Sequence, residues 1–157
     1  MVSIGGFDPH DNLTDKQPTL MRRVSEAITA CYDATVELGV ADKVTAFTAS
    51  DFGRTRSSNG DGSDHGWGSH HFMVGGAVKG RAFYGKAQPV SITNTADAHD
   101  QWHVAQRRLL PSTSVDQYAA TLAKWFGVSN TDLAGVMPTL RHFGGPEYPT
   151  ALGFLAA

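Results

Sequence analysis

The chain has 157 residues, of which 41% are hydrophobic and 18% are charged, and this balance is typical of one globular domain rather than a disordered segment. The formal net charge of −2 gives no electrostatic basis for binding nucleic acid or an anionic membrane, and no apolar run reaches the roughly 18 residues that span a bilayer. A single cysteine excludes an internal disulfide.

The first third of the chain has the pattern of a strand, a helix and a second strand. Residues 2–7 are predicted as a short strand. Residues 19–38 carry apolar side chains at helical spacing and predict a helix, with Pro18 near its first turn. Residues 43–50 are rich in β-forming residues and predict the next strand. Because the connections are short, these elements predict a βαβ unit whose two strands are parallel.

Charged side chains follow both of these predicted strands. Asp8 and His10 come directly after the first strand, and Asp51 comes directly after the second. The carboxyl ends of parallel strands meet at one edge of a sheet, which is where α/β proteins bind their ligands. We therefore expect these three side chains to lie close together.

The rest of the chain predicts two strands, an irregular stretch and two helices. Residues 72–78 and 82–84 predict strands joined as a hairpin, and residues 88–111 have poor periodicity. Ser114 and Gln117 have the spacing of a capping box, which predicts a helix over residues 114–126. Residues 130–137 predict a short helix that stops before a proline.

Residues 51–71 are predicted as a polar, glycine-rich loop that carries further carboxylates and imidazoles. These groups bind zinc, manganese or iron, and carboxylates also suit calcium. Together with the strand-end residues they predict a divalent-metal site with ligands drawn from Asp8, His10, Asp51, Asp64, His65, His70 and His71. Arg54 is placed to hold an anionic oxygen bidentately. In the alternative, these are ordinary surface residues, and Arg54 forms a salt bridge or a cap.

The chain also resembles a known family. The resemblance rests on five motifs in chain order, namely GGFDPHDN, VTAFTASDFGRT, NGDGSDHGWGSHHFMVGGAVKG, PSTSVDQYAATLAKWFGV and LGFL. These motifs are similar to the C-terminal part of the exported bacterial proteins called domain of unknown function 1501. Members of that family are usually longer and often carry a twin-arginine export signal. The resemblance therefore implies that residues 1–157 are a single domain, a fragment of a larger one, with a periplasmic location.

That family is in turn similar to the alkaline phosphatase and sulfatase superfamily. Its large α/β sandwich holds one or two divalent metals at strand ends, beside a nucleophile on an early strand that would precede this chain. The resemblance implies a partly parallel sheet flanked by helices, like the C-terminal half of the sandwich. It also implies that Asp8 and His10 match the first metal-binding group, although one residue separates them instead of three. Asp51 matches the second group, with Phe52 where a His is expected.

These observations predict three alternative functions. The first is metal-dependent hydrolysis of a small phosphate or sulfate ester, with Arg54 holding the anion and with the nucleophile segment missing. The second is a non-catalytic module that binds a metal or another ligand. The third is a structural assembly component without a metal. A half-sheet leaves unpaired strand edges, which predicts self-association or pairing with the missing N-terminal half.

Overall fold

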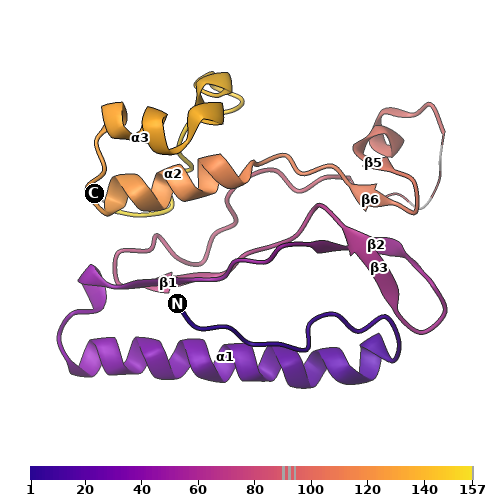
Figure 1. Cartoon of the computed structure of the whole chain (residues 1–157), viewed down its shortest axis with the longest axis horizontal. Coiled ribbons are helices and arrows are strands. Elements are labelled where there is room, and N and C mark those ends of the chain that lie inside the picture. The colour runs from indigo at the N-terminus through magenta and orange to yellow at the C-terminus, as the bar shows by residue number, and fades with distance from the viewer. Residues whose placement is uncertain (90, 92, 94, 157) are drawn as a thin grey trace. The chain divides into compact units, whose positions relative to one another are not determined.

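Two compact units make up the chain in the computed structural model, which describes residues 1–89, 91, 93 and 95–156 (Figure 1). The first unit comprises Met1–Gly75 and Gln88–Pro111, and the second comprises Gly76–Ala87 and Ser112–Ala157. Helices and short strand pairs make both α and β structure, as predicted. Among the described residues, no helix has the length and apolar character to cross a membrane. A single domain over the whole chain stays a prediction.

The longest helix, α1 (Leu13–Glu37), confirms the predicted helix but begins at Leu13 rather than residue 19. Pro18 therefore lies inside the helix, where it removes one backbone hydrogen bond. The predicted apolar stripe packs only in part, because Leu20 and Thr35 are the residues of α1 that are buried. Cys31, which has helical spacing with Leu20, is exposed.

The predicted parallel strand pair is wrong. A strand does form within residues 43–50, but this strand, β1 (Thr45–Phe47), pairs antiparallel with β4 (Met73–Gly75). Residues 2–7 form no strand, since Gly6 has a φ of 94° in the left-handed half of conformational space. Every sheet among the described residues has two antiparallel strands, so the expected half of an alkaline phosphatase-like sheet is not found there.

Residues 51–71, predicted as a loop, contain a β-hairpin. Its strands β2 (Gly53–Ser58) and β3 (Ser63–Gly66) pair antiparallel. In β2, buried Gly53 and Thr55 alternate with more exposed positions, which is the period of a strand with one covered face. The covered residues are small and polar rather than apolar, so hydrophobic periodicity does not reveal the hairpin.

The predicted irregular stretch 88–111 also contains regular structure, although its residues 90, 92 and 94 lie outside the described part. A 3₁₀ helix, η2 (Ala98–Trp102), leads into β5 (His103–Val104), which pairs antiparallel with β6 (Arg108–Leu109). Arg108 Nε donates a hydrogen bond to the backbone oxygen of His65 at 3.0 Å. The β5–β6 pair is thereby joined to β3 of the hairpin.

In the second unit, helix α2 (Val115–Trp125) begins as the sequence predicts. The Ser114 side chain accepts a hydrogen bond from the backbone N–H of Gln117 at 3.2 Å. In return, the Gln117 side chain accepts one from the backbone N–H of Ser114 at 2.9 Å. Gly127, with a φ of 100°, follows the last turn, as is common at helix ends.

The core of the second unit forms where the next two helices pack on α2. These are α3 (Asn130–Val136), which confirms the predicted short helix, and the 3₁₀ helix η3 (Pro138–His142). A hydrophobic cluster joins the three helices through Ala120, Leu133 and Leu140. The predicted strand 82–84 does not form, and Val78 forms an isolated antiparallel bridge with Leu155 instead.

Removal of the α2 cap gives the first testable prediction. Ser114→Ala leaves the Gln117 N–H without its acceptor, and we expect the free energy of unfolding to fall by about 1 kcal/mol. Urea denaturation followed by circular dichroism measures this loss. Thr139→Ala, an exposed hydroxyl on η3, serves as the control and should change stability by less than about 0.5 kcal/mol. Equal stabilities for the two variants would contradict the role of the cap.

Candidate metal centre

Three side chains of metal-ligating type come together on the surface of the first unit. Asp8, His10 and His65 each offer one ligand atom, and these atoms lie within 4.8 Å of one another. Asp8 Oδ1 is 2.6 Å from His65 Nε2 and 3.0 Å from His10 Nε2. Ligand atoms around a tetrahedral zinc lie about 3.3 Å apart, since each is about 2.0–2.1 Å from the metal. The two observed distances are about 0.3 and 0.7 Å shorter than this, so the three side chains would have to move apart slightly to admit a metal.

Local structure brings these three side chains together. Asp8 and His10 lie on the segment before α1 and flank Pro9, which is buried, whereas His65 lies on β3. The hairpin connection approaches this segment closely at Gly62. A Cβ at Gly62 would lie 2.0 Å from the backbone oxygen of His10, so a larger residue there would push the two segments apart. The glycine-rich sequence therefore serves a close backbone contact.

A carboxylate outside the ligand group orients His10. His10 Nδ1 lies 3.4 Å from Asp64 Oδ1, and Asn59 Nδ2 donates to the same oxygen at 3.2 Å. When Nδ1–H points to Asp64, the Nε2 lone pair of His10 is left to face a metal. Carboxylate partners of this kind fix the tautomer of a metal-binding imidazole and raise its basicity. The contact gives Asp64 a positioning role.

Phe52 supports the second imidazole. Its ring stacks on the ring of His65 with the centroids 3.8 Å apart and the planes inclined by 6°. The guanidinium carbon of Arg54 lies 5.3 Å from the Phe52 centroid. Stacking limits rotation of the His65 ring and keeps its Nε2 atom on Asp8. Phe52 is therefore an aromatic support for His65.

Arg54 ties the ligand-bearing segments together. From β2, its Nη1 atom donates to the backbone oxygen of Ser63 at 2.7 Å, and Nη2 donates to that of Phe7 at 2.7 Å. Nη2 also contacts Asp8 Oδ1 at 3.3 Å. A planar guanidinium makes such a set of directed contacts in a way that a lysine cannot. These contacts fix the backbone next to Asp8 against the backbone next to His65.

The environment of Asp8 keeps its carboxylate ionised. The hydrogen bond with His65 is the largest cause of a lowered pKa for Asp8, and partial desolvation opposes it. Electrostatic interactions with His65, His10 and Arg54 lower this pKa further. An ionised carboxylate with two imidazoles is a donor set suited to zinc, manganese or iron.

The chain matches a family model over most of its length. Residues 1–137 match the model of the family described as Protein of unknown function (DUF1501). The chain belongs to this family. Every residue of the candidate centre lies within the DUF1501 match. The comparisons with curated proteins and with solved structures gave no match. The similarity to the C-terminal part of the DUF1501 family and to alkaline phosphatases stays a prediction.

Other predicted ligands of this DUF1501 chain lie apart from the centre. Among the described residues, the groups of three ligand-type side chains include neither Asp51 nor His70 nor His71. Asp51 and His70 are exposed, and His71 is half-buried. Burial, together with the charge of His70, lowers the pKa of His71. The expected edge of parallel strands, which was to bring Asp51 to Asp8, does not form.

A second group of ligand-type side chains, Asp97, His99 and Asp100, has a different character. Asp100 is buried and accepts hydrogen bonds from the side chains of Ser91, Thr93 and Thr95. The backbone N–H of Thr95 also donates to it at 2.9 Å. These hydrogen bonds hold the pKa of Asp100 far below its usual range. Its carboxylate is thereby the centre of a hydrogen-bonded turn and not an open ligand.

The role of Arg54 in this DUF1501 protein gives the second testable prediction. We expect Arg54→Lys to lower zinc affinity about tenfold, because the Asp8 segment loses its link to β3. Competition with a chromogenic zinc chelator measures the change. Arg56→Lys, an exposed position on the same strand, provides the matched control and should leave affinity unchanged. Equal loss in both variants would contradict a positioning role for Arg54.

Proposed function

We propose that this protein is a metal-dependent hydrolase of small phosphate or sulfate esters, with a divalent transition metal held by Asp8, His10 and His65. The proposal rests on the convergence of two imidazole Nε2 atoms on one carboxylate oxygen, at 3.0 and 2.6 Å. Two imidazoles and one carboxylate resemble the donor sets of catalytic zinc sites, which keep an open position for water or substrate. Imidazole donors favour zinc, manganese or iron over calcium.

The residues around the three ligands have distinct roles in this proposal. A bound divalent metal supplies Lewis acidity, which polarises an ester oxygen or activates water. The side chains of Asp8, His10 and His65 are 53%, 46% and 46% exposed, so an ester can reach them from solvent. Arg54 has five N–H donor groups, and its three contacts occupy only some of them. Its remaining N–H groups are donors for an anionic ester oxygen.

The ester class is inferred from the family resemblance. Alkaline phosphatases and sulfatases act on anionic esters, and the segment with Asp8 and His10 resembles their first metal-binding group. The same resemblance supports a periplasmic location, and in this chain a water activated by the metal would supply the attacking oxygen. Asp64 and Phe52 support the two imidazoles through the contacts described above, which is the preorganisation that a metal site requires.

Turnover of a chromogenic ester tests this function. The full chain, loaded with zinc or manganese, is assayed with 4-nitrophenyl phosphate and 4-nitrophenyl sulfate. We expect metal-dependent release of nitrophenol that His65→Ala abolishes and that His142→Ala, an exposed His of η3, leaves unchanged. Stoichiometric metal without turnover would contradict hydrolysis and favour the non-catalytic binding module. Absence of metal binding would favour the structural component.

A further inference from the structure

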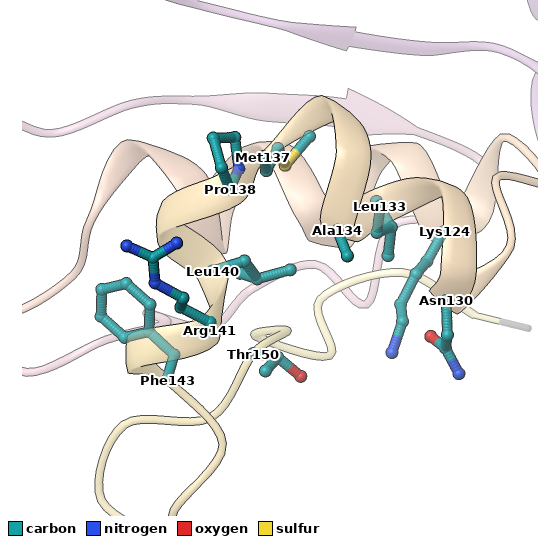
Figure 2. A pocket seen from close by; sticks show the side chains of 10 residues that line it. All are labelled: Lys124, Asn130, Leu133, Ala134, Met137, Pro138, Leu140, Arg141, Phe143 and Thr150. Atoms are coloured by element: carbon teal, nitrogen blue, oxygen red, sulfur yellow. The ribbon is translucent and has the colours of Figure 1, made fainter.

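A groove of about 370 Å³ lies in the second unit, formed by the end of α2, by α3 and by η3 (Figure 2). It is open to solvent and is lined mainly by the apolar side chains of Leu133, Ala134, Met137, Leu140 and Phe143. Its size is in the range of ligand-binding pockets, about 300–1,000 Å³. It shares no residue with the candidate metal centre, so an inference from it does not rest on the proposed hydrolysis.

The groove has a cationic side chain at each end. Lys124 lies at one end of the lining and Arg141 at the other, with Leu133, Ala134 and Leu140 between them (Figure 2). Both residues are exposed, and the lining contains no acidic residue. Neither cation forms an ion pair with any residue in the described part of the chain. The surface is thus apolar in its middle and positively charged at both ends.

This pattern indicates the chemistry of an occupant. We propose that the groove binds a short peptide segment whose apolar side chains are flanked on both sides by carboxylates. The apolar residues of such a segment fill the middle of the groove, as in other grooves that bind peptides. Its terminal carboxylates meet Lys124 and Arg141, and this charge complementarity fixes the register and disfavours basic peptides.

A small-molecule ligand with one anionic group fits the groove less well than a peptide. Small-molecule sites bury about 70–90% of the ligand surface, which an open groove does not achieve. A ligand with one anionic group also leaves one of the two cations unused. A peptide that extends along the groove covers the apolar lining and meets both charges.

A labelled peptide tests this proposal on the full chain. The probe is fluorescein-labelled DLLFLE with an amidated C-terminus, and fluorescence anisotropy measures its binding. We expect saturable binding that Lys124→Gln and Arg141→Gln each weaken about two- to fivefold, as for exposed ion pairs. Lys79→Gln and Arg81→Gln remove the same charges from exposed positions of the same unit outside the lining, and should have no effect. The uncharged peptide NLLFLQ should bind the wild type more weakly and be insensitive to Lys124→Gln.

A second pair of variants tests the groove itself without changing charge. Ala134→Trp places a large side chain in the groove from an exposed position of α3, and we expect more than tenfold weaker binding. Val136→Trp, at an exposed position of the same helix outside the lining, should bind normally. Unchanged affinity in Ala134→Trp, or in both Lys124→Gln and Arg141→Gln, would overturn the proposal. It would also fail if dodecanoate bound where the peptide did not, or if a second copy of the chain occupied the groove.

Discussion

His65→Ala should remove the metal from the candidate centre. We expect the zinc, manganese or iron content of chelator-free protein to fall from near one equivalent to near zero, and affinity to fall at least about 100-fold. His65 supplies one of three donors, and its Nε2 lies 2.6 Å from the Asp8 oxygen on which the group converges. Loss of this donor leaves one imidazole and one carboxylate, which hold a transition metal weakly. Elemental analysis and competition titration measure the two quantities.

A control variant distinguishes metal bound at the candidate centre from metal bound adventitiously to other histidines. The chain has seven histidines, and adventitious binding to exposed imidazoles would fall by a similar fraction in any His→Ala variant. His10→Ala should behave as His65→Ala, whereas His142→Ala should retain full metal content. If metal content fell equally in all three variants, or if the wild type held no metal and ignored added metal, the proposed centre would be wrong.

The start of α2 could be predicted because its determinants are local, whereas α1 begins at Leu13 and not at the predicted residue 19. The capping box of Ser114 and Gln117 depends on residues three positions apart, and the structure has both of its hydrogen bonds. Strand pairing depends on residues that are far apart in the chain, and the sequence alone did not predict which strands pair. The pairing of Thr45 with Gly75 joins segments 30 residues apart (75 − 45), and nothing in either segment specifies the other. The left-handed conformation of Gly6 is incompatible with the strand that residues 2–7 were expected to form beside residues 43–50.

The composition of the candidate centre was partly predictable. Asp8 and His10 are neighbours in sequence, and His65 belongs to a segment whose His and Asp content was evident. Asp51 belongs to the expected ligand set only through a parallel strand pairing, and the structure has an antiparallel pairing instead. The stacking of Phe52 on His65 could not be foreseen, because it depends on the geometry of a hairpin that hydrophobic periodicity does not reveal.

Burial was the least predictable property, and Phe126 and Phe154 of the second unit illustrate this. Phe126 has helical spacing with inward residues of α2 but is 83% exposed, whereas Phe154 lies in the C-terminal segment without periodicity and is 0% exposed. Phe154 packs against the rings of Tyr84 and Tyr118, with centroid distances of 5.9 and 5.8 Å. Its backbone oxygen accepts a hydrogen bond from Lys79 N–H at 2.9 Å. An unpatterned segment therefore supplies a central residue of this unit.

Phe154→Ala should be among the most destabilising substitutions in the chain. We expect the free energy of unfolding of the second unit to fall by about 3–5 kcal/mol, because a cavity replaces a fully buried ring. Hydrogen exchange at the amides of α2, together with urea denaturation, measures this loss in the unit concerned. Burial raises the pKa of Tyr118 to about 12, and the variant should let this phenol titrate nearer its usual value of about 10.

Phe126→Ala provides the matched control, since it removes the same side chain from a mostly exposed position of the same unit. Its free energy of unfolding should change by less than about 0.5 kcal/mol. A large loss in Phe154→Ala with a small one in Phe126→Ala would confirm that the C-terminal segment is part of the core. Equal small losses would contradict the packing of Phe154 against Tyr84 and Tyr118, because a ring removed from a loose segment leaves no cavity.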